Sequence, residues 1–448
     1  MSSEPFETTI GEQLTLQRGF DITRKQQQSG PVPVVSSGGI SSYHSEAKVN
    51  GPGVVLGRKG SLGTVFFLEE RFWPHDTTLW VKDFKGNNPR FVYYFFSGMA
   101  GELKKMDVGA ANPALNRNHV HPLSIRWLSR ESQDEVVKTL SSLDRKISLN
   151  RQINQTLEQM AQAIFKSWFV DFDPVKAKIA ALDAGGSEED ALLAAMQAIS
   201  GKSDRQLERL RNASPKQYAE LCATAELFPS AMQKSVLGDI PEGWEVLPLS
   251  NMVDLLGGGT PKKSEPSYWN GDICWFSVKD APKEGDVFVI DTEDKITDAG
   301  LNGSSTKLLP IGTAIITARG TVGKLALTGV VTAMNQSCYG VVASDGSGPY
   351  LNYLRLCRAV DTLKRNTHGA VFDTITRTTF ETVVQSQSSL EVRQRFEKLV
   401  EPVFEAIKGN LHEAKTLCEL RDTLLPKLLS GELTIPVAEE QVAEVADA

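Results

Sequence analysis

The sequence predicts an α+β protein in which two similar mixed α/β domains are separated by two long helices that form an antiparallel coiled coil. Residues 131–173 and 391–432 each carry apolar side chains at alternating steps of three and four, a repeat typical of a coiled-coil helix. Corresponding positions lie a constant 260 residues apart, as Ile147 and Ile407 show. Motifs outside the helices keep this offset, so we interpret the chain as a tandem duplication with a pseudo-twofold relation between its copies.

Side chains on the seam of this repeat, and two aromatic residues beside it, are expected to pack in the coiled coil or at a subunit interface. The first helix contributes Leu140, Leu143, Ile147, Asn150, Leu157, Ile164, Phe165, Trp168 and Phe169, and the second contributes Val400, Val403, Ile407, Asn410, Leu417, Leu424 and Leu428. Asn150 and Asn410 occupy equivalent central positions, where antiparallel packing would bring them together and asparagine would fix the register. A hydrated gap or local fraying is the alternative. We expect Pro402 to kink or restart the second helix, and Pro426 to loosen its last turns.

Composition places the chain among globular proteins. Of its 448 residues, 41% are hydrophobic and 23% are charged, and the chain shows neither a run of about 18 apolar residues nor a charged-then-apolar leader. The five cysteines are scattered without a CxxC pair, which favours a reducing compartment, so we expect a cytoplasmic protein. The net charge of −7 argues against a simple nucleic-acid coat, although residues 1–130 hold 15 basic and 11 acidic side chains.

Turn-rich and helical stretches divide the chain into six segments. We predict a first mixed α/β domain at 1–128, a first long helix at 129–173, a helical connector at 174–240, a second domain at 241–386, a second long helix at 387–433 and a disordered acidic tail at 434–448. Asp173-Pro174 is expected to end the first helix, because proline disfavours helical geometry in the residue before it. Short apolar runs bounded by glycine and proline predict the strands.

Two glycine-rich turns, at 57–63 and 317–323, are related by the 260-residue offset. Their polar side chains are Arg58, Lys59 and Ser61 in the first turn, and Arg319, Thr321 and the adjoining Lys324 in the second. Exposed backbone amides together with arginine, lysine and hydroxyl side chains are what contacts to phosphates and base edges require. The alternative is that the glycines serve only a tight connection between strands.

Two motifs fall short of the enzyme sites they resemble. The Gly-Gly-Gly-Thr-Pro-Lys-Lys-Ser run at 257–264 fails the P-loop spacing, because Lys262 occupies the position of the required glycine. Asn88-Pro and Asn112-Pro lack the second proline of the Asn-Pro-Pro-aromatic clamp of amino-methyltransferases, and no glycine-rich loop suited to a methyl donor follows a strand. Neither motif therefore predicts an active site.

A nuclease site is the remaining catalytic alternative. Glu293-Asp-Lys295, with Asp280 or Asp286 upstream, is the one nuclease-like arrangement of carboxylates and lysine, and such triplets arise by chance in charged loops. His119-x-His121 has no further ligands at a useful spacing, so we expect no metal site. On these residues the chain is expected to be non-catalytic.

Six further motifs occur in order along nearly the whole chain. They are Gly-Arg-Lys-Gly-Ser-Leu-Gly at 57–63, Phe-Trp-Pro-His-Asp-Thr-Thr at 72–78, Phe-Lys-Ser-Trp-Phe-Val-Asp-Phe at 165–172, Gly-Asp-Ile-Pro-Glu-Gly-Trp at 238–244, Met-Asn-Gln-Ser at 334–337 and Leu-Leu-Pro-Lys-Leu-Leu-Ser-Gly at 424–431. With the duplication, this order resembles the specificity subunit of a type I restriction–modification enzyme. The resemblance implies two target-recognition domains, joined by two helical regions that form an antiparallel coiled coil.

The resemblance also implies partners and cofactors. The partners are double-stranded DNA, two modification subunits that methylate adenine, and restriction subunits that translocate and cut DNA. These partner subunits bind S-adenosylmethionine, ATP and Mg, and this chain itself holds no cofactor. Phe165, Trp168 and Phe169 are expected to pack between the helices, with contact to a modification subunit as the alternative.

Two unlike domains imply a bipartite, asymmetric DNA site with an unread spacer. Reading heads on one face of the duplex favour half-sites about 10–10.5 bp apart. The residues expected to contact DNA are Arg58, Lys59, Ser61, Arg117, Lys262, Lys263, Arg319, Thr321, Lys324, His368 and Arg377. A nuclease, or a stand-alone DNA-binding protein without methyltransferase partners, is the alternative.

Overall fold

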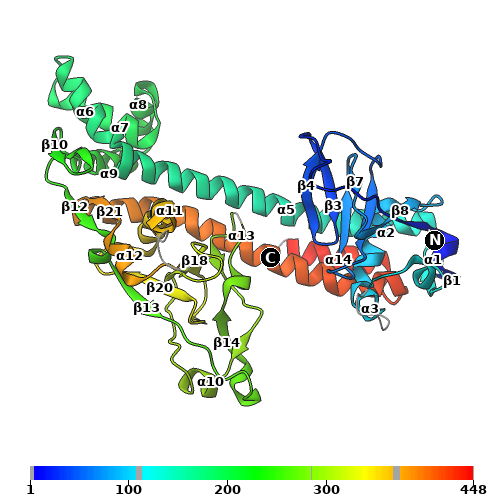
Figure 1. Ribbon diagram of the computed structural model, residues 1–448. Helices are drawn as coiled ribbons and strands as arrows, with labels where there is room; N and C mark the ends of the chain where they lie inside the picture. The colour runs from blue at the N-terminus through cyan, green and yellow to red at the C-terminus, as the bar shows by residue number, and fades with distance from the viewer. Residues whose placement is uncertain (1–4, 107–113, 284, 367–373, 447–448) are drawn as a thin grey trace. The chain divides into compact units, whose positions relative to one another are not determined.

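The computed structural model describes residues 5–106, 114–283, 285–366 and 374–446. The chain divides into two compact units, one formed by residues 1–148 with 414–448 and the other by residues 149–413 (Figure 1). Each unit holds one mixed α/β domain and one part of both long helices.

The first domain is built from two small sheets. The four-stranded antiparallel sheet has the order β2-β8-β5-β6, with β2 at Thr15–Arg18, β5 at Gly53–Gly57, β6 at Val65–Leu68 and β8 at Thr78–Asp83. The three-stranded sheet has the order β4-β3-β7, with β3 at Val32–Ser36, β4 at Gly39–His44 and β7 at Trp73–Pro74. Strand β1 (Phe6–Thr9) pairs with β9 (Ser124–Trp127). The helices are α1 (Ile10–Gln13), α2 (Pro89–Gly98), α3 (Ala100–Lys105) and α4 (Arg117–Val120).

The second domain repeats this plan with one more strand. Its larger sheet has the order β13-β20-β17-β18-β15, with β13 at Val253–Gly257, β15 at Phe288–Val289, β17 at Ala314–Thr317, β18 at Leu325–Thr328 and β20 at Cys338–Ala343. Its smaller sheet has the order β16-β14-β19, with β14 at Trp269–Phe276, β16 at Lys295–Ile296 and β19 at Thr332–Met334. Strand β12 (Glu245–Pro248) pairs with β21 (Val384–Gln387). The helices are α10 (Asp298–Asn302), α11 (Pro349–Asn366) and α12 (Arg377–Glu381), with 3₁₀ turns η2 (Leu249–Asn251), η3 (Pro266–Tyr268) and η4 (Val278–Asp280).

The two domains share strand order and strand direction. In each smaller sheet the central strand pairs antiparallel with one neighbour and parallel with the other, as β3 does with β4 and β7, and β14 with β16 and β19. Strands β8 and β20, and strands β9 and β21, start 260 residues apart. The predicted duplication of one domain is therefore confirmed at the level of topology.

The long helices are α5 (Arg130–Lys166), continued by the π-helical turn η1 (Ser167–Asp171), and α13 (Leu390–Ser430). In the first unit, Leu140 and Leu143 near the start of α5 share a core with Leu424 near the end of α13. In the second unit, Phe165 near the end of α5 shares a core with Phe396 near the start of α13. The two helices therefore run antiparallel, as predicted.

Aromatic packing stabilises the helix pair in the second unit, where α5 ends and α13 begins. The rings of Phe165, Trp168 and Phe169 lie with their centroids 6.1, 5.6 and 5.1 Å from that of Phe396. These three side chains are buried between the helices, whereas Leu157, Ile164 and Val403 are only partly buried.

Proline interrupts neither half of the second long helix, whereas the first long helix ends just before Pro174, as predicted. Helix α13 continues unbroken through Pro402 and Pro426, so of the two predicted effects of Pro402 the restart is wrong. Val400 and Phe404 on either side of Pro402 are fully buried, and this packing offsets the loss of one backbone hydrogen bond. The first helix ends at Phe172, which has a left-handed conformation with φ of 58°, and Pro174 lies in the first turn of the next helix.

The connector forms four helices with a core of their own, which includes Ala195, Met196 and Leu207. These helices are α6 (Asp173–Asp183), α7 (Glu188–Ser200), α8 (Asp204–Ala213) and α9 (Pro215–Glu226). The hairpin of β10 (Met232–Ser235) and β11 (Gly238–Pro241) follows them. Of the described helices, none combines the length and the apolar character that a membrane span requires.

The acidic tail is not disordered over its described part. Residues Ile435–Ala446 form helix α14, and Ala438 is fully buried in the core of the first unit, with Val442 packed against it. The expectation of disorder is therefore wrong for this segment, because apolar side chains spaced four apart give it a face that packs on the folded domain.

A buried polar network lies where each domain meets the start of a long helix. In the first unit, Asn87 Oδ1 accepts hydrogen bonds from Trp127 Nε1 at 2.8 Å and Gln133 Nε2 at 2.7 Å. In the second unit, the Asp345 carboxylate bonds Arg355 Nη1 at 2.7 Å and Arg393 Nη1 at 2.6 Å. Gln133 and Arg393 are related by the 260-residue offset, so equivalent helix positions hold an amide network in one unit and an ion-pair network in the other.

Candidate nucleic-acid interface

The glycine turn of the first domain is fixed by backbone hydrogen bonds. Gly57 N donates to Thr64 O at 2.8 Å and closes the turn, while Arg58 N donates to Thr77 O at 2.9 Å. Arg58 O accepts a hydrogen bond from Leu115 N at 2.9 Å. Gly63 has a positive φ of 73°, and a Cβ there would lie 2.5 Å from Ala100 O, so this position requires glycine.

The second domain contains the same backbone frame. Thr317 N donates to Lys324 O at 2.9 Å, Ala318 N donates to Ser337 O at 2.7 Å, and Ile375 N donates to Ala318 O at 3.0 Å. All of these residues lie 260 after their counterparts in the first domain. Each turn therefore joins three equivalent chain segments of its own domain. The exposed loop side chains of the two domains are thus held on backbones of the same arrangement.

Most of the residues predicted to contact DNA are exposed on these frames or beside them. Lys59, Ser61, Arg117, Arg319, Thr321, Lys324 and Arg377 are exposed, and Arg58 is partly buried. Arg117 follows directly on the segment that bonds the first turn, and Arg377 follows on the equivalent segment of the second domain. Lys262 and Lys263 are exposed on a different loop, between β13 and η3, and His368 lies outside the described residues.

Not all of these side chains are available to DNA in the conformation observed. The Arg377 guanidinium donates to Leu255 O at 2.7 Å, and Lys262 O accepts hydrogen bonds from the Trp269 indole at 3.1 Å and from Glu265 N at 3.1 Å. Arg377 thus anchors helix α12 to strand β13. The backbone carbonyl of Lys262 orders its loop, and the Lys262 side chain is exposed.

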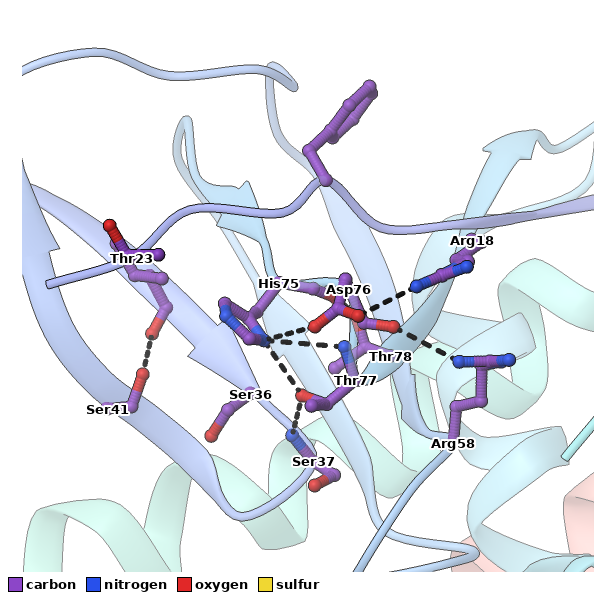
Figure 2. A network of polar contacts seen from close by, with 12 residues as sticks. Arg18, Thr23, Ser36, Ser37, Ser41, Arg58, His75, Asp76, Thr77 and Thr78 are labelled. Atoms are coloured by element: carbon purple, nitrogen blue, oxygen red, sulfur yellow. Dashed lines mark hydrogen bonds and ion pairs between the residues drawn. The ribbon is translucent and has the colours of Figure 1, made fainter. Parts of the chain in front are cut away.

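A charged cluster beside the first turn was not predicted. Arg18 Nη2 lies 2.8 Å from Asp76 Oδ2, His75 Nδ1 lies 3.1 Å from Asp76 Oδ1, and Arg58 Nη1 donates to Asp76 O at 3.4 Å. Figure 2 shows the Arg18 and Arg58 side chains both directed toward Asp76. One carboxylate residue therefore organises two arginines and a histidine at the edge of the glycine turn.

Charge and burial shift the pKa values within this cluster. Burial acts to raise the pKa of Asp76, but the hydrogen bond from Arg18 and the charges of nearby basic groups outweigh it and hold the pKa below its ordinary value. Burial and the neighbouring Arg18 charge lower the pKa of Arg58. Asp76 is accordingly an anion that holds basic side chains in place.

The second domain carries a neutral counterpart of this cluster. Asn335, Gln336 and Ser337 lie 260 after His75, Asp76 and Thr77. Thr260 Oγ1 donates to Gln336 Oε1, and Ser337 N donates to Asn335 Oδ1 at 2.9 Å. Arg18 pairs with Leu79 across the first sheet as Gly257 pairs with Tyr339 across the second, so Thr260 follows shortly after the position equivalent to Arg18.

The sequence signals for these residues were the 260-residue offset between 75–77 and 335–337 and the motifs at 72–78 and 334–337. They indicated the duplication and the family resemblance and said nothing of Arg18, which is 58 residues away from Asp76 in the chain. The antiparallel pairing of β2 with β8, in which Arg18 pairs with Leu79, brings Arg18 close to Asp76, which lies just before β8.

Asp21, His75 and Asp76 also have ligand atoms within 4.8 Å of one another. A dication placed there would meet the Arg18 guanidinium, which already lies against the Asp76 carboxylate at 2.8 Å. The resulting repulsion makes the group a poor metal site, and we assign no metal to it.

The nuclease-like side chains make local contacts that order their loops. Asp280 accepts hydrogen bonds from Ser277 N and from Glu293 N, both at 2.8 Å. Lys295 pairs with Asp291 at 3.1 Å, while burial raises the pKa of Asp286. His121 likewise has a structural role, because its Nε2 accepts a hydrogen bond from Leu16 N at 3.0 Å.

The chain contains two domains of one topology, and each leads into a helix of the coiled coil. Each domain carries exposed basic residues on an equivalent turn, which is the arrangement of a duplicated recognition protein. The family model of the type I restriction modification DNA specificity domain matches residues 7–159 and 241–384. The chain belongs to this family.

Relatives of the chain agree with this membership. It is 38% identical over 329 residues to the type I restriction enzyme HindI specificity subunit of Haemophilus influenzae, covering 72% of this chain and 71% of the relative. It is 24% identical over 351 residues to the MjaIX specificity subunit of Methanocaldococcus jannaschii, covering 77% and 69%. The crystal structure of the S subunit from M. genitalium has the same fold, with a TM-score of 0.51 and 13% identity over 95% of this chain and 96% of that one.

The protein is therefore a specificity subunit of a type I restriction–modification system, and it recognises DNA sequence with two domains. It is a non-catalytic subunit, and catalysis lies in partner subunits. The comparisons give no support to the nuclease or to the stand-alone alternative.

Proposed function

We propose that this subunit reads a bipartite, asymmetric DNA site, with one half-site for each target-recognition domain and an unread spacer between them. The observation that carries this proposal is the repeated backbone frame. The bonds of Arg58 with Thr77 and Leu115 have exact positional counterparts in the bonds of Ala318, but the side chains on the two frames differ. A shared frame with different polar groups supports equivalent placement on DNA and different base preferences.

The assembly is proposed to contain two modification subunits that methylate adenine, together with restriction subunits that cut DNA. The modification subunits bind S-adenosylmethionine, and the restriction subunits use ATP and Mg. Each domain and its helix form one copy of the repeat, with domains at 1–128 and 241–386 and helices at 129–173 and 387–433. Two copies of one repeat provide two equivalent docking positions, which supports the number of modification subunits.

The DNA contacts are proposed to come from basic and hydroxyl side chains of both domains. They are Arg58, Lys59, Ser61 and Arg117 in the first domain and Lys262, Lys263, Arg319, Thr321, Lys324, His368 and Arg377 in the second. Arginine and lysine can contact either base edges or phosphates, and the contacts to phosphates make binding sensitive to salt. Because the net charge of the chain is −7, the attraction to DNA phosphates is proposed to come from local basic patches.

Reconstitution tests the proposed function directly. The purified subunit alone should neither methylate nor cleave DNA. With modification subunits and S-adenosylmethionine it should direct adenine methylation to one two-part sequence. Methylation at the same sequence by the modification subunits alone, or cleavage by this subunit alone that Lys295→Ala abolishes, would contradict the proposal.

A further inference from the structure

The Asp76 position of the first domain and the Gln336 position of the second are equivalent, yet their chemistry differs. Asp76 lies one residue before Thr77, and Gln336 lies one residue before Ser337. The carbonyl groups of Thr77 and Ser337 accept equivalent hydrogen bonds from the glycine turns of their domains. Asp76 bonds the Arg18 side chain, which is 56% exposed. Gln336 is exposed and bonds the Thr260 hydroxyl.

We propose that these equivalent positions read one base in each half-site. Arg18, held by Asp76, reads a guanine in the half-site of the first domain, and Gln336, held by Thr260, reads an adenine in the half-site of the second. This inference rests on the proposed function, because it assigns base contacts to the two domains.

The geometry of Arg18 suits a guanine edge. Among the described residues its guanidinium makes one hydrogen bond, from Nη2 to Asp76 Oδ2 at 2.8 Å, and its remaining N–H groups stay available as donors. Two parallel N–H groups match the O6 and N7 acceptors of guanine in the major groove. Because Asp76 fixes the side chain before binding, less rotamer entropy is lost when the base is contacted.

The Asp76 carboxylate argues against a phosphate as the group that Arg18 contacts. A phosphate beside the guanidinium would also approach Asp76, whose pKa lies below its ordinary value and which is therefore ionised at neutral pH. The edge of guanine carries no net charge and meets no such repulsion. The pair of Arg18 and Asp76 therefore favours a base over the DNA backbone.

Gln336 has the complementary groups for adenine. The Thr260 hydroxyl donates to its Oε1, which orients the amide and leaves a second lone pair on that oxygen. Oε1 can then accept from adenine N6 while Nε2 donates to adenine N7. A neutral amide offers no net charge to a phosphate, so this position too suits base recognition.

The test uses the complete methyltransferase assembly, made from this chain and its modification subunits, on DNA libraries that carry the recognition site with single randomised positions. The wild-type assembly should require guanine at one position of one half-site and adenine at one position of the other. Arg18→Ala should lower the preference for that guanine about tenfold to a hundredfold and leave the other half-site unchanged. Gln336→Ala should relax only the adenine.

Arg209→Ala is the matched control, because it removes one exposed arginine from connector helix α8. It should leave every base preference unchanged. Asp76 is a positioning residue, so Asp76→Asn should weaken the same guanine preference less than Arg18→Ala does. In the double variant that carries Arg18→Ala and Asp76→Asn, the change at Asp76 should add nothing to the loss of guanine preference caused by Arg18→Ala. A merely structural role of Asp76 would lower methylation of all sequences alike.

The outcomes separate the inference from the function beneath it. A uniform loss for Arg18→Ala across all sequences, with a smaller dependence of binding on salt, identifies a phosphate contact and overturns the inference. A half-site without the required guanine or adenine overturns it as well. Failure of the wild-type assembly to methylate any two-part site would instead count against the proposed function.

Discussion

Asn87 and Asp345 are each buried where a domain meets a long helix, but only Asp345 carries a charge. The side chains of Asp345, Arg355 and Arg393 are 5%, 3% and 7% exposed. Burial acts to raise the pKa of Asp345, but the charge of Arg355 and the hydrogen bonds from Arg355 and Ser347 together outweigh it, so the pKa lies below its ordinary value. Two arginines around one carboxylate form a network in which every member depends on the others.

Asp345→Asn should destabilise the second unit by about 3–5 kcal/mol, because it removes the carboxylate with which both buried guanidinium groups pair. Urea unfolding at neutral pH measures the change, with the exposed Asp254→Asn as control. Because folding lowers the pKa of Asp345, the stabilisation by its ion pairs is present above the ordinary aspartate pKa. It is lost as pH falls through the pKa of Asp345 in the folded chain. A loss as small as that of the control would contradict this assignment.

His121 predicts a second pH effect at a higher pH. Burial, followed by the charges of Arg117 and Lys85, lowers the pKa of His121, whose ring accepts a hydrogen bond from Leu16 N. The folded chain therefore binds fewer protons than the unfolded chain, and its stability falls as pH drops from about 6.5, the ordinary histidine pKa, through the lower folded pKa.

His121→Gln should flatten this part of the stability profile, because glutamine can accept the same hydrogen bond without titrating. Denaturant unfolding between pH 5 and pH 8 measures the slope. His119→Gln is the matched control, since His119 is exposed two residues away. Equal slopes for the two variants would show that His121 is not the titrating group.

At the scale of single elements, an asparagine cluster lies at the centre of the coiled coil. Asn410 Nδ2 donates to Asn154 Oδ1 at 2.8 Å, Asn154 Nδ2 donates to Ile407 O at 3.2 Å, and Asn150 Nδ2 donates to Glu413 Oε2 at 2.7 Å. The predicted meeting of Asn150 and Asn410 is confirmed by a bond of 3.4 Å from Asn150 Nδ2 to Asn410 O. These bonds form in one alignment of α5 and α13, which is how asparagine specifies register.

Asn410→Leu should lower the free energy of unfolding by about 1–3 kcal/mol, because the buried Asn154 oxygen loses its donor. The double variant with Asn154→Leu should recover most of this loss, since both polar groups are then replaced by apolar ones. A double-mutant cycle in urea measures the coupling. Additive losses would show that the two side chains do not depend on each other.

The elements show how far sequence reasoning reaches. The heptad repeat and the 260-residue offset predicted both long helices, their antiparallel pairing and the duplicated domains. Those signals are periodic and local, so they survive without coordinates. The hydrogen bond of Leu16 with His121 and the ion pair of Arg18 with Asp76 join residues 105 and 58 positions apart, and no spacing in the sequence announces them. Helix α14 was missed because its stability comes from packing on a distant core.

The candidate interface was predicted unevenly for the same reason. Charge and glycine content identified the turns that carry Lys59 and Arg319, which the structure leaves exposed. They could not distinguish Arg377, which bonds Leu255 O in its own domain, from a side chain free to reach DNA. Composition identifies which groups can bind DNA, whereas tertiary contacts decide which of them are already engaged.

At the scale of the whole molecule, two domains with one topology should act on DNA independently. Arg319→Ala removes an exposed charge from the turn of the second domain only. It should weaken recognition of one half-site and leave the base preferences of the other unchanged, which randomised half-site libraries measure. Equal losses in both half-sites would contradict two separate reading domains, and the same library read with Lys59→Ala should show the converse pattern.

Methylome sequencing of cells that carry the complete system, with and without this chain, tests the central claim most directly. With the chain present, methylated adenines should fall within one motif of two unlike specified parts separated by an unread spacer, and this motif should disappear when the chain is removed. A single uninterrupted motif, or methylation that persists unchanged without the chain, would contradict the claim that one molecule carries two reading domains.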